Sequence, residues 1–112
     1  MPMSAFLHAT PRGNPQQILA SVWQRNLPLV RQRLQALRCA ADQSHAGQLT
    51  APVRTEAASI AHKLAGSLGM FGYPQGSDIA KHLEALLEGD MPIAADEFET
   101  LTTQLEQTLS LN

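Results

Sequence analysis

The stretch at residues 59–74, SIAHKLAGSLGMFGYP, combines the apolar spacing of a helix with three glycines. Its large apolar residues recur at steps of three and four, which is the period of an amphipathic helix. These residues are Ile60, Leu64, Leu68 and Phe71. Because an interior glycine costs a helix roughly 1 kcal/mol relative to alanine, the glycines need an explanation. Gly72, followed by Tyr73 and Pro74, predicts the end of one helix and the immediate start of the next.

The first part of the chain predicts one long helix that contains a proline. From Pro15 to Ala41 the apolar residues again recur at steps of three and four. Pro28 lies inside this pattern. Because proline lacks an N–H and clashes with the preceding turn, we expect a kink, or a break between two helices, near residues 24–28. The following stretch at 42–52, DQSHAGQLTAP, is expected to form a loop.

Three shorter helices are predicted after this loop. The second helix runs over about residues 51–71, with Thr50 as its N-cap. The third runs over about residues 74–88, and Pro92 opens the fourth, because proline is tolerated in the first turn of a helix. Four amphipathic helices joined by short links are typical of an antiparallel bundle.

Length and composition support a single helical domain. The 112 residues suffice for one modest core, and the chain is 44% hydrophobic but only 4% aromatic, with few residues that favour strands. We therefore predict an all-α fold, an antiparallel four-helix bundle over residues 15–112. Residues 1–14 are expected to form an N-terminal tail or a short extra helix.

Charge and cysteine content exclude several classes of partner. The formal charge is -2 and the eight Lys and Arg residues are scattered, so the chain lacks the basic stripe of a nucleic-acid-binding protein. The lone Cys39 cannot form an internal disulfide. No apolar run approaches the ~20 residues that span a bilayer. We therefore expect a soluble cytoplasmic protein that binds neither nucleic acid nor membrane.

A helical wheel of the second helix places His62 opposite the apolar stripe. The residues within about 60° of it are all small, and they are Ala58, Ser59, Ala65, Gly66 and Gly69. This predicts a docking face on which a partner protein approaches an accessible imidazole. Histidine suits phosphoryl acceptance because its unperturbed pKa of about 6.5 leaves a neutral, nucleophilic nitrogen at physiological pH. The alternative is an ordinary exposed histidine, beside small residues that permit close helix packing.

The motif at residues 61–72, AHKLAGSLGMFG, resembles the signature of histidine-containing phosphotransfer (Hpt) domains, and the resemblance covers about residues 15–111. The matching positions are His62, Leu64, Gly66, Ser67, Gly69, Phe71 and Gly72. The chain is also similar to the phosphotransfer domain of chemotaxis-type histidine kinases, where a glutamate of the next helix hydrogen-bonds the histidine. In an ungapped comparison this glutamate is Glu84. The resemblance implies that His62 is phosphorylated and that Glu84 orients it.

The chain departs from the family at the cation near the histidine. The family commonly places Lys or Arg three residues after the histidine, where this sequence has Ala65. Lys63 and Lys81 are the candidates for neutralising the phosphoryl charge instead. An alternative for Glu84 is a surface ion pair, because Lys81, Glu84 and Glu88 have i,i+3 and i,i+4 spacing.

The resemblance implies a phosphoryl carrier and not an enzyme. Such a carrier passes the group on His62 to or from an aspartate of a response-regulator receiver domain, and a histidine kinase is the other expected partner. The receiver supplies Mg²⁺, so no cofactor is expected for this chain. No Walker-type loop or dinucleotide fingerprint predicts a nucleotide site, and no HxxxH or CxxC spacing predicts a metal site. We expect a monomer.

Two alternatives to a free-standing carrier are open. The first is a pseudo-Hpt docking or dimerisation bundle that is not phosphorylated, and Ala65 is the residue that motivates it. The second is the phosphotransfer segment of a larger sensor kinase or regulator.

Overall fold

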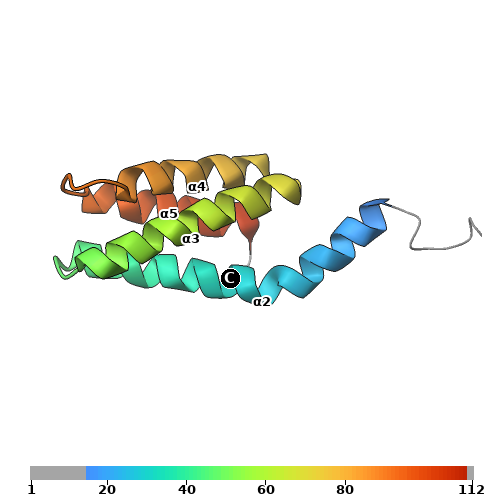
Figure 1. Ribbon diagram of the computed structural model, residues 1–112, viewed down its shortest axis with the longest axis horizontal. Helices are drawn as coiled ribbons and strands as arrows, with labels where there is room; N and C mark the ends of the chain where they lie inside the picture. Colours follow the sequence, from blue (N-terminus) through green and yellow to red (C-terminus); the bar gives the residue numbers. More distant parts are fainter. Residues whose placement is uncertain (1–14, 111–112) are drawn as a thin grey trace, which may run out of the picture.

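The computed structural model describes residues 15–110, and in this part of the chain all regular structure is helical. The predicted all-α bundle is therefore confirmed (Figure 1). Its helices are α2 (Pro15–His45), α3 (Ala51–Met70), α4 (Pro74–Leu87) and α5 (Ala95–Leu109). Each helix packs against the two that adjoin it in a closed ring, α2 against α3 and α5, and α4 against α3 and α5. The expected N-terminal tail, residues 1–14, lies outside the described residues.

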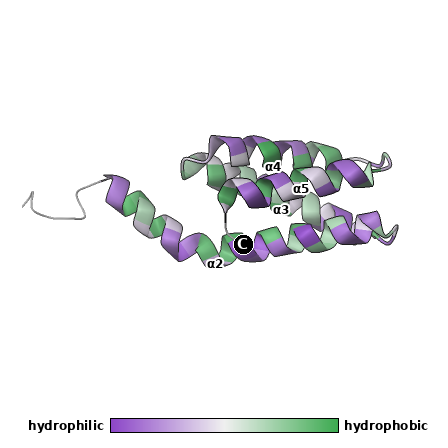
Figure 2. Cartoon of the chain, turned by 180° about the vertical axis from the view of Figure 1, so that it is seen from behind, coloured by the Kyte–Doolittle hydropathy of each residue, from purple (hydrophilic) through white to green (hydrophobic). Residues whose placement is uncertain are grey.

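Helix α2 is a single helix of 31 residues that bends at a proline. Pro28 lies inside it, and Figure 1 shows its amino-terminal part leaving the bundle at an angle. The expected interruption is therefore a kink and not a break, as follows from the loss of one backbone hydrogen bond. We call residues 15–27 the arm. Figure 2 shows hydrophobic and hydrophilic residues mixed along the arm, where Ile18 and Leu19 are exposed.

Aromatic side chains join the arm to the rest of the molecule. The ring of Trp23 lies 5.1 Å from the ring of Phe71 and 4.9 Å from the ring of Tyr73, measured between centroids. Such distances are those of favourable aromatic pairs. The arm therefore rests on the turn between α3 and α4.

The core consists mainly of leucine side chains contributed by all four helices. The largest fully buried residues are Val30, Leu37, Leu64, Leu68, Leu83, Leu87, Phe98, Thr102 and Leu105. The hydroxyl of Thr102 donates to the carbonyl of Phe98 at 2.8 Å, so this buried polar group is satisfied.

A polar cluster fastens α2 to α5 beside this core. The guanidinium of Arg38 donates to both carboxylate oxygens of Glu106, at 2.7 and 3.1 Å, and to Glu99 at 2.8 Å. It also donates to the hydroxyl of Thr103 at 2.9 Å. Hydrogen bonding to Glu106 raises the pKa of Arg38 above its already high usual value. We call these four residues the Arg38 cluster.

The ends of α3 follow the rules that the sequence suggested. At its start, the N–H of Val53 donates to the hydroxyl of Thr50, which confirms the predicted N-cap. At its end, Gly72 has a φ of +87°, and the N–H of Tyr73 donates to the carbonyl of Leu68 at 2.8 Å. This is a Schellman ending, in which glycine is favoured because it tolerates a positive φ.

The predicted start of the last helix is wrong by three residues. Pro92 lies in the loop after α4, and α5 begins only at Ala95. Asp96 and Glu97 then lie in the first turn, where the helix dipole favours carboxylates. No helix among residues 15–110 combines the length and apolar character needed to cross a membrane.

Candidate functional site

His62 of α3 and Glu84 of α4 form a pair at the surface of the bundle. The Nδ1 atom of His62 lies 2.9 Å from Oε2 of Glu84. The imidazole is 73% exposed, whereas the Glu84 side chain is only 23% exposed. Because an ionised carboxylate can only accept, Nδ1 carries the proton and donates it. In the neutral ring, Nε2 is then left with a free lone pair on the solvent side.

Small residues at the contact between α3 and α4 allow the two helices to approach closely enough for His62 and Glu84 to meet. Gly76 of α4 is buried, and a Cβ added there would lie only 3.1 Å from Cδ1 of Leu68. The hydroxyl of Ser77 is also buried and donates to the carbonyl of Ala65 at 2.7 Å. Larger side chains at these two positions would push the helices apart. The close approach of α3 and α4 is therefore built into the sequence of both helices.

The predicted docking face is open at most, but not all, of its five positions. Ser59, Gly66 and Gly69 are exposed, and Ala58 is half-buried. A Cβ added at Gly66 would meet nothing within 4 Å, so no packing contact in the described structure requires glycine there. A Cβ added at Gly69 would lie at an ordinary contact distance, 3.4 Å, from Oγ of Ser77.

Ala65 departs from the prediction, because it is buried. Only 7% of it is exposed, and Ser77 of α4 hydrogen-bonds its carbonyl. A wheel centred on the large apolar residues places Ala65 on the open face, but α4 covers the flank of α3 that carries Ala61 and Ala65. The physical reason is that two alanines allow the closest helix contact on that flank. Ile60 and Phe71, by contrast, are only half-buried.

The two candidate lysines lie on the surface without ion pairs. Lys63 of α3 and Lys81 of α4 are both exposed, and within residues 15–110 neither pairs with a carboxylate. The surface ion pair considered for Glu84 with Lys81 is therefore absent from the described structure, where the carboxylate of Glu84 contacts His62 instead. Both lysines remain candidates for contacting a phosphoryl group.

A surface groove runs from this pair toward the carboxyl end of α4. His62 and Glu84 line it together with Arg54, Ser59 and Glu88. Arg54 was not singled out by the sequence patterns. Its Nε donates to the carbonyl of Leu87 at 2.8 Å, and its Nη2 lies 3.5 Å from the carbonyl of Glu88. The sequence did contain a signal for such a residue. Because α4 has no basic residue in its own last turn, a cation from another helix is favoured at that negative helix end.

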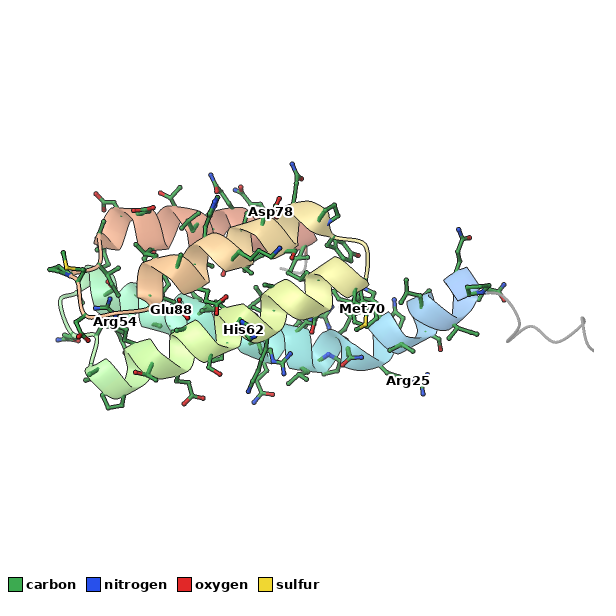
Figure 3. The ribbon with its side chains drawn as sticks, turned by 45° about the horizontal axis from the view of Figure 1, so that its top comes forward. Arg25, Arg54, His62, Met70, Asp78 and Glu88 are labelled. Carbon is green, nitrogen blue, oxygen red and sulfur yellow. The ribbon has the colours of Figure 1, made fainter. Side chains whose placement is uncertain are left out.

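Figure 3 shows how these residues are arranged along the two helices. His62 lies midway along α3, Arg54 and Glu88 lie together at one end of the helix pair, and Met70 lies at the other end. Among residues 15–110 no group of three His, Cys, Asp or Glu side chains is arranged to hold a metal ion. The arrangement provides an exposed nucleophilic nitrogen whose ring is oriented by a carboxylate.

Comparisons with known proteins show the family of the chain. Residues 21–110 match the family described as the Hpt domain. Protein RcaC from Microchaete diplosiphon is 35% identical over 108 residues, which cover 91% of this chain and 17% of that protein. The chain thus spans less than a fifth of the length of this curated relative. No solved structure matches the chain.

Proposed function

The chain belongs to the Hpt domain family, and from this premise we propose that His62 is the residue that carries the phosphoryl group. Hpt domains exchange phosphoryl groups with receiver domains and kinases in phosphorelay signalling. The observation that carries the proposal is the imidazole of His62, which is 73% exposed and whose Nδ1 lies 2.9 Å from Oε2 of Glu84. The Nε2 atom of such a ring can reach a phosphorus atom on another protein without rearrangement of the bundle.

The transfer step follows from this geometry. The lone pair of Nε2 attacks the phosphorus of an aspartyl phosphate in line with the breaking bond. The N–P bond forms as the P–O bond to the aspartate breaks, and the electron pair of that bond stays with the aspartate carboxylate. The imidazole of His62 becomes cationic because it keeps its Nδ1 proton. Glu84 stabilises this developing charge through the hydrogen bond that it already accepts.

The partner supplies the rest of the chemistry in this proposal. Mg²⁺ comes with the receiver domain, so this chain needs no cofactor of its own and acts as a carrier and not as an enzyme. Lys63 and Lys81, exposed and without ion pairs in the described part of the chain, would contact the phosphoryl oxygens. The exposed residues Ser59, Gly66 and Gly69 would form the face on which the receiver docks. We place the exchange in the cytoplasm, where the exposed thiol of Cys39 stays reduced.

A second candidate is a pseudo-Hpt bundle that docks to receivers without being phosphorylated. The observation in its favour is Ala65, which stands where the family commonly has a cation. The proposal that the chain acts as a segment of a larger regulator also has support, because its curated relative is much longer.

Phosphotransfer with radiolabelled donors distinguishes the carrier from the docking bundle. The protein is incubated with a phosphorylated receiver domain or a histidine kinase, and acid-labile label on the bundle is measured. We expect label on the unchanged protein and none on His62→Gln. His45→Gln is the matched control, because His45 is similarly exposed, at 66%, and lies at the carboxyl end of α2. Label that persists in His62→Gln would show that another residue is the acceptor, and no label on any variant would favour the docking bundle.

A further inference from the structure

The carboxyl end of α4 is held by a residue of another helix. The last four carbonyls of a helix have no partner within the helix, and they form its negative end. In α4 the carbonyl of Glu84 accepts from the N–H of Glu88, but the carbonyl of Leu87 lies beyond the last such bond. The helix has no basic residue of its own in this last turn. Its end therefore needs a donor from outside.

Arg54 of α3 provides that donor. Its Nε donates to the carbonyl of Leu87 at 2.8 Å, and its Nη2 adds a longer contact of 3.5 Å to the carbonyl of Glu88. A guanidinium suits this position because it is always charged and its donors are arranged in a fixed fork. The side chain is half-buried in the groove that also contains His62 and Glu84. Arg54 thus ties the end of α4 to α3.

The contact between Arg54 and Leu87 lies at one end of the α3–α4 pair, and another side-chain hydrogen bond joins the two helices at the opposite end. Near the turn that joins α3 to α4, the hydroxyl of Ser77 holds the carbonyl of Ala65 at 2.7 Å. Glu84 lies between these two points, three residues before Leu87. Because the site depends on one hydrogen bond between α3 and α4, the position of the last turn of α4 decides whether Glu84 reaches His62.

We propose that Arg54 is a positioning residue for the phosphoryl acceptor, acting through the last turn of α4. The proposal rests on the proposed function of His62. Arg54 and His62 are eight residues apart on one helix, about 12 Å along its axis, so Arg54 does not act by touching the ring. Without Arg54 the last turn of α4 loosens, the carboxylate of Glu84 leaves Nδ1, and the ring loses the tautomer that leaves Nε2 free.

Two measurements on purified variants test this proposal. The first is the ¹⁵N chemical shift of the His62 ring nitrogens, which reports the tautomer. The second is the rate of phosphorylation by phosphoramidate, a small donor that needs no docking surface. We expect Arg54→Met to shift the ring toward a mixture of tautomers and to slow phosphorylation about tenfold, within the roughly hundredfold effect that a misplacement of 1 Å can have. Arg54→Lys keeps one donor for Leu87 and is expected to give intermediate values of both.

The controls separate positioning from general stability and from the function of His62. Arg31→Met removes an exposed arginine that has no ion pair in the described part of the chain, and it is expected to change neither measurement. In a Glu84→Gln background, Arg54→Met should slow phosphorylation by less than about twofold, because both changes act on the same contact.

Four results bear against the proposal or against its premise. An unchanged tautomer and rate in Arg54→Met overturn the role of Arg54. An equal slowing in the Glu84→Gln background overturns the route through Glu84. If the unchanged protein is not phosphorylated at all, the function of His62 fails, but the tautomer still tests Arg54 separately. If circular dichroism shows that Arg54→Met loses helicity, the test uses Arg54→Lys and Arg54→Gln instead. The proposal is then overturned if both of these variants have the tautomer and the phosphorylation rate of the unchanged protein.

Discussion

Removing Arg38 tests whether the Arg38 cluster holds α2 to α5. The variant is Arg38→Met, which keeps most of the apolar stem and removes the guanidinium. Four hydrogen bonds to Glu106, Glu99 and Thr103 are lost. The carboxylate of Glu106, whose side chain is only 17% exposed, is left without its cation. The free energy of unfolding should therefore fall by more than it does for an exposed arginine.

The magnitude follows from how deeply the cluster is buried. Breaking a fully buried ion pair costs about 3–5 kcal/mol, whereas an exposed pair contributes about 0–1 kcal/mol. Arg38 and Glu106 are about four-fifths buried but Glu99 is 42% exposed, which places the cluster between these limits. We expect a loss of about 2–3 kcal/mol. For a domain of this size the loss corresponds to a fall in Tm of roughly 8–20 °C.

Urea unfolding followed by circular dichroism measures this loss, with the slope m expected to stay unchanged. The pKa of Arg38 is raised in the folded protein. The stability that its charge contributes is therefore fully present at any pH below the ordinary pKa of arginine, and it is lost only as the pH rises through the raised pKa. The loss should therefore be the same at about pH 6 and pH 9. Glu106→Gln in the Arg38→Met background should recover part of it, because no unpaired carboxylate remains. A loss below about 0.5 kcal/mol, the level expected for Arg31→Met, would refute the reasoning.

Four further substitutions, at three positions, have expected effects of different kinds. Gly66→Ala should stabilise the bundle by about 0.5–1 kcal/mol in thermal unfolding, because an added Cβ meets nothing within 4 Å. Gly66→Leu should block transfer from a receiver domain but change the rate of phosphorylation by phosphoramidate by no more than about threefold. Equal rates of transfer from the receiver to the two variants would argue against this docking face. Gly72→Ala should lower the free energy of unfolding by about 1–2 kcal/mol, because its φ is +87°, and a neutral result in urea titration would contradict that explanation. Glu84→Gln should slow phosphorylation of His62 about tenfold. In metal sites, removing the carboxylate that hydrogen-bonds a histidine costs about 10- to 100-fold, and we take the low end of that range. A rate equal to that of the unchanged protein would show that the 2.9 Å contact does not assist the reaction.

The sequence predicted the elements whose causes are local. The periodic apolar residues located all four helices, and Thr50 and Gly72 marked the ends of α3 correctly because capping depends on neighbours within a few residues. The exposure of His62 also followed from the wheel, since it lies nearly opposite Ile60 and Leu64 of its helix. The pairing of His62 with Glu84 came from the family resemblance and not from periodicity.

The features that the sequence did not predict depend on the register between helices. Ala65 is buried because α4 covers one flank of α3, and no pattern within α3 shows which flank is covered. Arg54 reaches Leu87, and Arg38 reaches Glu106, across 33 and 68 residues of sequence respectively. Such contacts require the relative rotation and translation of two helices, which is set by side-chain packing across the whole core.

The kink in α2 places the only tryptophan of the chain at a joint between two parts of the molecule. Since the centroid of the Trp23 ring lies about 5 Å from the centroids of the Phe71 and Tyr73 rings, the emission of Trp23 reports whether the arm contacts the α3–α4 turn. Circular dichroism reports helix content throughout the chain. Comparing the two signals during denaturation therefore reveals, without any introduced label, whether the arm detaches as an independent cooperative unit or melts together with the four-helix body.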